Sequence, residues 1–535
     1  MNCSLRVRAI TAILLVGISC NSKNDKKGET EPTFLPSTAS FNSLIGPTKD
    51  NVISYLPARA GKTDWGLALS GGGIRSATYS IGVMKALYDL GVLDSLDVIS
   101  SVSGGGYASY WLYTNYQQRS SGVGRFGATA FSDDVFIQNL CQLQVSGRFV
   151  PVSAALRSVV DVSSGRASRA FDDYEQAIWR VFSNGAAQQG NLASARLLVD
   201  DKKAPFFILN TTVTGTDVKK VSQRNLLENT LALTPAYFGN QKVGTHPWSD
   251  LSPCLVRWSE AVTMSAAALS PLRHHMNYKT PTGQQESVLL YDGGRSENLA
   301  ALNLIQQGLK NIIIVDAAQD SDYTFEAYNQ LRKLLRPLGY EFNVPAIDLV
   351  AENPSRSIRK REKMRAKYHR LGQSVYLGYA RPIAQDTDKT GALTSTVYYI
   401  KMALPTSLEN KIRNIAAFDK GKSLALRRDQ LKRRGCQALA TFPFQQDLFT
   451  YKVSRYSQDI AQRFRSRTTS FAPSVFRLGF PQTTTADQDF KADQLEAFVG
   501  LGYLQGIELK KHFPAKGIAA NSRPSPGVQL VSSEP

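Results

Sequence analysis

The sequence of 535 residues predicts a three-layer α/β/α fold with a mainly parallel central sheet. Two observations lead to this prediction: short apolar runs alternate with helical patterns along the chain, and glycine-rich turns follow several of these runs. Strands that alternate with helices favour a parallel sheet covered on both faces, because each connection lays a helix against the sheet. We therefore expect a functional site at the carboxyl ends of the strands.

The predicted strands are short and rich in branched or aromatic residues. They are Trp65–Leu69, Val98–Val102, Phe206–Thr214, Val288–Tyr291 and Ile312–Val315. Helices are expected at Ala77–Leu90, with Gly91 just beyond its end, and at Asn298–Gln307. A chain of this length can bury a substantial core and allows one large α/β domain or two ordinary ones. We expect residues 55–517 to form one domain with insertions at about 114–204 and 350–375.

The N-terminus has the pattern of a signal peptide over residues 1–20. Arg6 and Arg8 precede the apolar stretch Ala9–Ile18, and small residues lie next to Cys20. The apolar stretch is well short of the ~20 residues that a spanning helix needs. The segment resembles a bacterial lipoprotein signal with Cys20 as the lipidated residue, although Gly17 replaces the usual Leu, Val or Ile. Simple secretory cleavage is the alternative, and both predict an exported protein, either membrane-anchored or periplasmic or secreted.

Two further segments have compositions that cannot bury a core. Residues 21–54 begin with a polar and charged run and are expected to be a flexible linker, and residues 518–535 are expected to be a disordered tail.

The chain is strongly basic, with 63 Lys and Arg against 44 Asp and Glu and a formal net charge of +19. Such a surface attracts nucleic acid and anionic lipid headgroups alike. Two clusters contain many of these charges: Arg356, Arg359, Lys360, Arg361, Lys363, Arg365, Lys367 and Arg370, and then Arg427, Arg428, Lys432, Arg433 and Arg434. An exported chain without a nucleic-acid motif favours an anionic membrane surface as partner and no nucleic acid, with solvated helix faces as the alternative.

The first glycine-rich turn is Ser70-Gly71-Gly72-Gly73-Ile74-Arg75-Ser76, between a predicted strand and a predicted helix. Backbone N–H groups without neighbouring side chains can converge on a developing oxyanion at the start of a helix. An ordinary tight turn is one alternative. A nucleotide site is another, since the spacing of Gly71, Gly73 and Ser76 resembles a degraded dinucleotide fingerprint, but the Gly-Lys-Ser ending of a P-loop is absent.

The second turn follows Val98–Val102 and places Ser103 before three glycines. It resembles a nucleophile elbow, in which a serine on a strained strand-to-helix turn needs tiny neighbours. Ser101 occupies the first glycine position of that motif, so a plain turn residue is the alternative for Ser103 alone.

The third turn begins with Asp292-Gly293-Gly294, directly after the predicted strand Val288–Tyr291. An Asp-Gly-Gly sequence by itself is usually just a turn. Three glycine-flanked sites at strand ends of one sheet, however, bring an aspartate and a serine to the same edge.

These motifs, in this order, resemble the patatin-like phospholipases, in detail their bacterial members and the cytosolic phospholipase A2 catalytic domain. The resemblance covers Trp65 to about Asp320 and includes the small-residue stretch Ala261–Pro271, while Phe480–Tyr503 resembles a closing segment of some members. It implies a patatin-like fold in which Ser103 is the nucleophile, Asp292 its base, and Gly71, Gly72 and Gly73 the oxyanion hole. Arg75 resembles the family arginine that meets the substrate phosphate, and a salt bridge at the helix start is its alternative role.

The implied activity is that of a serine lipid acyl hydrolase of phospholipase A or lysophospholipase type, using a Ser-Asp dyad on phospholipid or lysophospholipid. An acyltransferase with the same acyl-enzyme, and an inactive lipid-binding lipoprotein, are the alternatives. A histidine base would make a triad instead, and the adjacent His274 and His275 are its best candidates. The 114–204 insertion, just after the nucleophile helix, could form a lid or an interfacial surface.

No cofactor and no metal is expected. The cysteines beyond Cys20 are Cys141, Cys254 and Cys436, which form no CxxC pair or Cys/His cluster with metal-ligand spacing. An acidic calcium loop is also absent from the sequence.

Overall fold

The computed structural model describes a set of segments that together form one sheet with its covering helices. They are residues 65–117, 131, 136, 139–140, 167–183, 190–195, 204–214, 229–240, 243–248, 256–268, 274–280, 282–320, 323–348, 374–383, 394–404, 482 and 492–513. The predicted signal peptide with Cys20, the linker 21–54, most of both insertions, both basic clusters and the tail 518–535 lie outside these residues and stay predictions.

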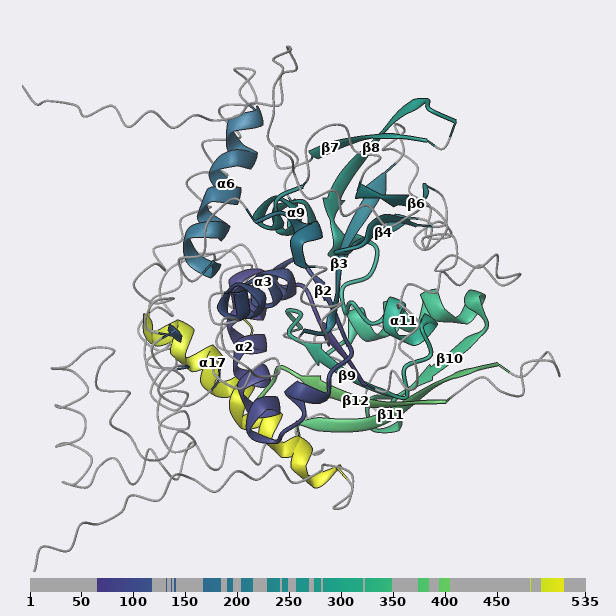
Figure 1. Cartoon of the computed structure of the whole chain (residues 1–535). Coiled ribbons are helices and arrows are strands. Elements are labelled where there is room, and N and C mark those ends of the chain that lie inside the picture. Colours follow the sequence, from purple (N-terminus) through teal and green to yellow (C-terminus); the bar gives the residue numbers. More distant parts are fainter. Residues whose placement is uncertain are drawn as a thin grey trace, which may run out of the picture.

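Twelve strands form the sheet. They are β1 (Trp65–Leu69), β2 (Val98–Val102), β3 (Phe206–Thr214), β4 (Thr230–Leu233), β5 (Tyr237–Asn240), β6 (Gly244–Pro247), β7 (His274–Lys279), β8 (Gln285–Asp292), β9 (Asn311–Asp316), β10 (Tyr340–Asn343), β11 (Val375–Pro382) and β12 (Ser395–Lys401). Their order is β10-β11-β12-β9-β1-β2-β3-β4-β5-β6, with β8 also paired to β3 and β7 paired to β8 (Figure 1).

The centre of the sheet is parallel, as predicted. Strands β12, β9, β1, β2 and β3 pair in parallel with one another. The flanks are antiparallel, because β10 pairs with β11 and β11 with β12 on one side, and β4, β5, β6 and β8 follow β3 on the other. The sheet is therefore mixed, with the parallel strands in the middle.

The helices are described with their bounds as follows. They are α2 (Gly73–Asp89), α3 (Gly104–Gln117), α6 (Ala167–Phe182), α9 (Trp258–Ser265), α10 (Leu302–Gln306), α11 (Glu326–Leu335), α12 (Pro345–Asp348) and α17 (Ala492–Gly506), with short 3₁₀ turns at Leu93–Ser95, Leu192–Ser194, Gly293–Arg295, Arg336–Leu338 and Ile507–Lys511.

Two helix predictions need correction at their first residue. Helix α2 begins at Gly73 instead of Ala77, since the glycine turn itself enters the helix. The helix predicted from Asn298 begins only at Leu302. There the Glu297 carboxylate accepts the Leu299 N–H at 2.6 Å and the Leu302 N–H at 3.3 Å, so a side chain caps the turn where helical bonds were expected.

The sheet separates two apolar cores, which gives the three layers. On β9, Ile313 and Val315 point into one core, while Ile312 and Ile314 point into the other. The first core is shared with α2, α3, α6, α9 and α17, and the second with α10, α11 and α12. The predicted α/β/α arrangement is confirmed, with each face of the parallel strands covered by helices.

Helix α17 packs along α2, although more than 400 residues separate them in the sequence (Figure 1). The contact is backbone to backbone. A Cβ atom on Gly82 would lie 2.0 Å from the Val499 carbonyl oxygen, and one on Gly502 would lie 2.0 Å from the Tyr79 carbonyl oxygen. Glycine at both positions therefore permits the close approach that brings the C-terminal helix onto the domain.

Among the helices that the structure describes, none combines the length and apolar character that crossing a membrane requires.

Candidate active site

Ser103 lies on a sharp turn between β2, which ends at Val102, and α3, which begins at Gly104. Its φ of 49° is in the left-handed region, which residues with a side chain rarely adopt. The Ser103 N–H donates to Ser265 Oγ at 2.9 Å, and its carbonyl oxygen accepts from the Gly106 N–H at 2.8 Å. The strained backbone is thus fixed from both sides, as the elbow pattern predicted.

Small residues around Ser103 allow the glycine turn to approach the elbow. A Cβ atom on Gly104 would lie 2.1 Å from the carbonyl oxygen of Gly73, and one on Gly71 would lie 3.4 Å from the Cβ atom of Ser103. The first turn and the second turn, which are about thirty residues apart in sequence, are therefore in direct contact beside the Ser103 hydroxyl.

The register of β3 brings Asp292 to the same place. On one side of β3, Asn210 pairs with Val102, the last residue of β2, and the next residue, Thr211, pairs with Asp292, the last residue of β8. Because β2 is parallel to β3 and β8 is antiparallel, the carboxyl ends of β2 and β8 meet head-on along β3. The predicted strand before Asp292 is therefore correct in place, but it reaches the site in the opposite direction from the parallel strands.

The Ser103 Oγ donates a hydrogen bond to Asp292 Oδ2 at 2.8 Å. The other carboxylate oxygen of Asp292 accepts from the Gly294 N–H at 2.8 Å. Burial raises the pKa of Asp292, while the bonds from Ser103 and Gly294 and the charge of Arg295 oppose that rise. The site thus holds a partly buried carboxylate with a raised pKa, in hydrogen-bond contact with the hydroxyl of the buried Ser103.

The three glycines of the first turn do not have equivalent N–H groups. The Gly71 N–H donates to the Asn298 carbonyl oxygen at 2.9 Å, so it already has a partner inside the protein. Gly72 has φ of 144° and Gly73 has φ of 62°, conformations that suit glycine and turn the chain sharply into α2. The turn thus lies next to Ser103 with Gly72 and Gly73 as its two residues of positive φ.

Arg75 is buried behind the glycine turn, with an exposed fraction of 1%. Its Nε donates to the Ala317 carbonyl oxygen at 3.2 Å, and burial lowers its pKa to about 10 against the opposing charge of Asp316. The described hydrogen bond of Arg75 thus lies inside the domain, and both roles that the sequence left open, a salt bridge at the helix start and a contact with the substrate phosphate, stay predictions.

The histidines proposed as alternative bases lie on β7. The His274 Nε2 is 3.8 Å from Glu260 Oε1, its ring packs against Phe171, and burial lowers its pKa to about 4. His275 is the neighbouring residue on the same strand and is exposed. The Ser103 hydroxyl donates to Asp292, whereas the contacts described for His274 are with Glu260 and Phe171.

Ser265 and Asn210 support the elbow, and their roles were not predicted. The Ser265 Oγ, which accepts from the Ser103 N–H, donates to the Asn210 carbonyl oxygen at 2.6 Å. The Asn210 Nδ2 donates to the Ser101 carbonyl oxygen at 2.9 Å. The signal available in the sequence was the small-residue stretch Ala261–Pro271, since α9 ends at Ser265 inside it.

The insertion after the nucleophile helix contributes α6, the part of it that is described at length. The Tyr174 hydroxyl hydrogen-bonds with that of Tyr107 on α3, and both tyrosines lie in the electrostatic field of Asp292. Glu175 accepts two bonds from Arg257, at 2.7 and 2.6 Å. Helix α6 therefore packs over the nucleophile helix, and the proposed lid remains a prediction for the rest of the insertion.

Within the described segments, no group of three or more His, Cys, Asp or Glu side chains is arranged to hold a metal ion.

Comparison with known proteins identifies one family. A family model described as Patatin-like phospholipase matches residues 67–305. No curated protein sequence matches the chain. Among solved structures, human GIVD cytosolic phospholipase A2 shows 12% identity and a TM-score of 0.45, with 84% of this chain and 59% of that one covered. The chain therefore spans about three-fifths of the length of that human protein.

Two other solved structures also resemble this chain at low sequence identity. The human protein in complex with methyl gamma-linolenyl fluorophosphonate shows 14% identity and a TM-score of 0.44, covering 84% of this chain and 57% of that one. VipD from Legionella pneumophila shows 12% identity and a TM-score of 0.22, covering 85% of this chain and 94% of that one.

Proposed function

Residues 67–305 belong to the patatin-like phospholipase family, and from this premise we propose that the protein is a serine lipid acyl hydrolase of phospholipase A or lysophospholipase type. The observation that supports this most directly is the 2.8 Å hydrogen bond from Ser103 Oγ to Asp292 Oδ2, on a strained turn beside a glycine loop. A serine and its base within hydrogen-bond reach, next to backbone donors, suit acyl transfer.

In the first step, Ser103 Oγ attacks the carbonyl carbon of the acyl ester, and its proton passes to Asp292 Oδ2. The tetrahedral intermediate then expels the alcohol, the lysolipid or glycerophospho part, which takes the proton from Asp292. An acyl group remains bound to Ser103. In the second step, water attacks this ester, gives its proton to Asp292, and the collapse of the intermediate returns that proton to Ser103 Oγ as the fatty acid leaves.

We assign the oxyanion contact to the N–H groups of Gly72 and Gly73, because the Gly71 N–H is already bonded to Asn298. Both glycines have positive φ and stand at the start of α2, where the helix dipole favours a charged oxygen. Gly71 shapes the loop in this proposal.

Asp292 must be a stronger base than an ordinary aspartate to accept a serine proton. The usual carboxyl pKa of about 3.9 is far below the pKa of a serine hydroxyl. Any rise in the carboxyl pKa therefore makes the proton transfer from serine less unfavourable. Burial raises the pKa of Asp292, and the Gly294 N–H holds the carboxylate in place while Oδ2 faces Ser103. The proposal is therefore a dyad whose base is strengthened by desolvation.

The substrates we propose are phospholipid and lysophospholipid, presented at an anionic membrane surface that the +19 charge attracts. Export, and lipidation of Cys20, fit this proposal and depend on residues outside the described part of the chain.

The test is acyl release from mixed phospholipid vesicles by purified residues 21–535, comparing wild type with Ser103→Ala and Asp292→Asn. We expect both variants to lose activity by on the order of 10³-fold or more, because nucleophile and base act as a unit. Ser80→Ala is the matched control, since the Ser80 hydroxyl is buried on α2 and has no hydrogen-bond partner in the described part of the chain. Wild-type inactivity on phospholipid, lysophospholipid and short acyl esters alike would refute the proposal.

Added lysolipid or alcohol acceptors separate hydrolysis from transfer. Fatty acid as the main product in their presence supports a hydrolase, because water then attacks the acyl-enzyme faster than the acceptor does. Acylated acceptor as the main product would make the protein an acyltransferase with the same nucleophile.

A further inference from the structure

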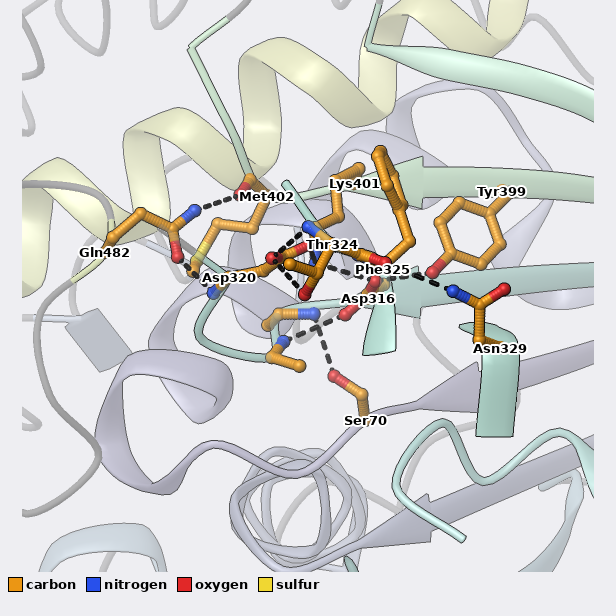
Figure 2. A network of polar contacts seen from close by, with 12 residues as sticks. Ser70, Asp316, Asp320, Thr324, Phe325, Asn329, Tyr399, Lys401, Met402 and Gln482 are labelled. Atoms are coloured by element: carbon orange, nitrogen blue, oxygen red, sulfur yellow. Dashed lines mark hydrogen bonds and ion pairs between the residues drawn. The ribbon is translucent and has the colours of Figure 1, made fainter. Parts of the chain in front are cut away.

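A cluster of buried charges lies behind the glycine turn, at the ends of two neighbouring strands. Asp316 ends β9, Lys401 ends β12, and the two residues are register partners. The Lys401 Nζ is 2.8 Å from Asp316 Oδ2 and 3.5 Å from Asp320 Oδ2 (Figure 2). Lys401 is 1% exposed and Asp316 is fully buried, so each charge depends on its partners in place of water.

Polar groups from distant parts of the chain complete the cluster. The Tyr399 hydroxyl donates to Asp316 Oδ2. Asp320 accepts from the Phe325 N–H at 2.9 Å, and its own N–H donates to Gln482 Oε1 at 2.6 Å. Figure 2 shows Asp316 and Asp320 next to Lys401, with Tyr399 beside Asp316 and Gln482 beside Asp320. All of them lie beyond residue 305, where the family match ends.

Asp316 in turn fixes the segment that follows it. Its Oδ1 accepts from the Ala318 N–H at 3.0 Å, which holds a tight turn over Asp316–Ala318. Within this turn the Ala317 N–H donates to Ser70 Oγ at 2.8 Å, and the Ala317 carbonyl oxygen accepts from Arg75 Nε at 3.2 Å. Ser70 and Arg75 flank the three glycines, so the turn holds both sides of the glycine loop.

Gly72 itself is packed against the same turn. A Cβ atom on Gly72 would lie 3.0 Å from the Ala317 carbonyl oxygen and 2.8 Å from an Arg75 guanidinium nitrogen. A shift of Ala317 would therefore move the peptide groups of the loop directly.

We propose that Lys401 is a positioning residue for the oxyanion loop: through Asp316 and the Asp316–Ala318 turn, its charge holds Ser70, Arg75 and the glycines between them. Lys401 forms ion pairs with the buried carboxylates of Asp316 and Asp320, and the buried Arg75 lies in the field of Asp316, so loss of Lys401 leaves an excess negative charge that pulls on Arg75. The catalytic consequence of this inference rests on the proposed function, because only a reaction that develops an oxyanion uses the loop. The expected effect on the order of the loop does not rest on the proposed function.

The test compares Lys401→Met, which keeps the length of the side chain and removes its charge, with Lys85→Met in the full-length protein. Lys85 is equally buried and forms an ion pair with Asp89, but it lies twelve residues along α2 from Gly73, about 18 Å at the rise of a helix. It is therefore a matched control with the same chemical change outside the loop.

The first measurement is hydrogen exchange of the peptide that spans residues 69–76. We expect on the order of tenfold faster exchange in Lys401→Met and no change there in Lys85→Met, because only the former loosens the Asp316–Ala318 turn. Unchanged exchange in Lys401→Met would overturn the inference, whether or not the protein hydrolyses lipid.

The second measurement is steady-state acyl release per active site. We expect kcat of Lys401→Met to fall by about 10- to 100-fold with KM nearly unchanged, since the loop contact is made in the transition state. A purely structural role would lower the amount of folded enzyme and leave kcat per active site intact, which would also refute the inference. Wild-type inactivity would instead count against the proposed function and leave the exchange result standing.

Lys401→Met could lose too much stability to fold, and Tyr399→Phe then replaces it. That change removes only the hydroxyl that donates to Asp316. We expect changes in the same two measurements and in the same direction, smaller by several fold, and their absence in a folded Tyr399→Phe protein would overturn the inference.

Discussion

The family-matched segment, residues 67–305, and the residues described between 306 and 513 contribute differently to the molecule. The first contains Ser103 and Asp292, the residues proposed for the chemistry. The second supplies β9 next to β1, β12 on the other side of β9, and helix α17 against α2. The comparison shows that the segment matched by the family model contains the residues proposed for the chemistry, while the other segment completes the sheet beside them.

The largest expected effect comes from ending the chain at residue 305. Strand β1 would become an edge strand without β9, and the face of α2 that contacts α17 would be exposed to water. We expect no cooperative thermal unfolding transition and strong aggregation for residues 55–305, measured by circular dichroism and light scattering. A cooperative transition in this fragment would break the comparison, because the second region would then be dispensable for folding.

The contact between the two regions can be tested by one methyl group. In Gly502→Ala the new Cβ would lie 2.0 Å from the Tyr79 carbonyl oxygen, so α17 must move away from α2. We expect a loss of about 1–3 kcal/mol in the free energy of unfolding, the usual cost of overpacking, measured by urea denaturation.

Gly190→Ala is the control for that experiment, since a Cβ atom there has nothing within 4 Å. It should leave stability within about 0.5 kcal/mol. Equal effects of the two changes would mean that α17 does not depend on close packing against α2.

Asp292→Asn tests the family-matched segment, because side chains that serve a reaction often reduce the stability of the fold. Burial raises the pKa of Asp292, so the native protein holds this proton more tightly than the unfolded chain does. The stabilising contribution of the protonated form is full below the unfolded pKa of about 3.9 and is lost as pH rises through the higher native value. At pH 7 we therefore expect Asp292→Asn to be more stable than wild type by on the order of 1 kcal/mol.

Denaturant unfolding at pH 7 and at pH 4 checks this expectation. The gain should shrink at the lower pH, where the native carboxyl is increasingly protonated. A gain that is independent of pH, or a loss at pH 7, would show that desolvation does not dominate at Asp292.

The smallest expected effect concerns the strained turn. Ser103→Gly and Ser103→Ala both remove the proposed nucleophile, but only glycine adopts the φ of 49° without strain. Relief of about 1–2 kcal/mol of left-handed strain exceeds the entropic cost of glycine, so Ser103→Gly should be more stable than Ser103→Ala by about 0.5–1 kcal/mol. Thermal denaturation of the two variants measures this difference, and equal stability would mean that the elbow is not strained.

The sequence was most informative where the signal is local. Strands β1, β2 and β3 have the predicted bounds, because a short apolar run between turn residues defines a buried strand by itself. The glycine turn, the elbow and the Asp-Gly-Gly turn also follow from adjacent residues. The start of α10 was missed because the Glu297 side chain, folded back on its own backbone, replaces the first helical bonds.

What the sequence by itself determined is which residues stand at strand ends: Ser103, Asp292 and the glycines of the first turn, together with the layered α/β/α fold. Only the tertiary structure decided that β8 runs antiparallel and meets β2 head-on along β3, and that Arg75 is buried. The pairing of Lys401 with Asp316 was likewise decided only by the tertiary structure. The physical reason is that periodicity and turn chemistry depend on neighbours in the chain, whereas strand direction, burial and ion pairing depend on groups that come together only when the whole sheet assembles.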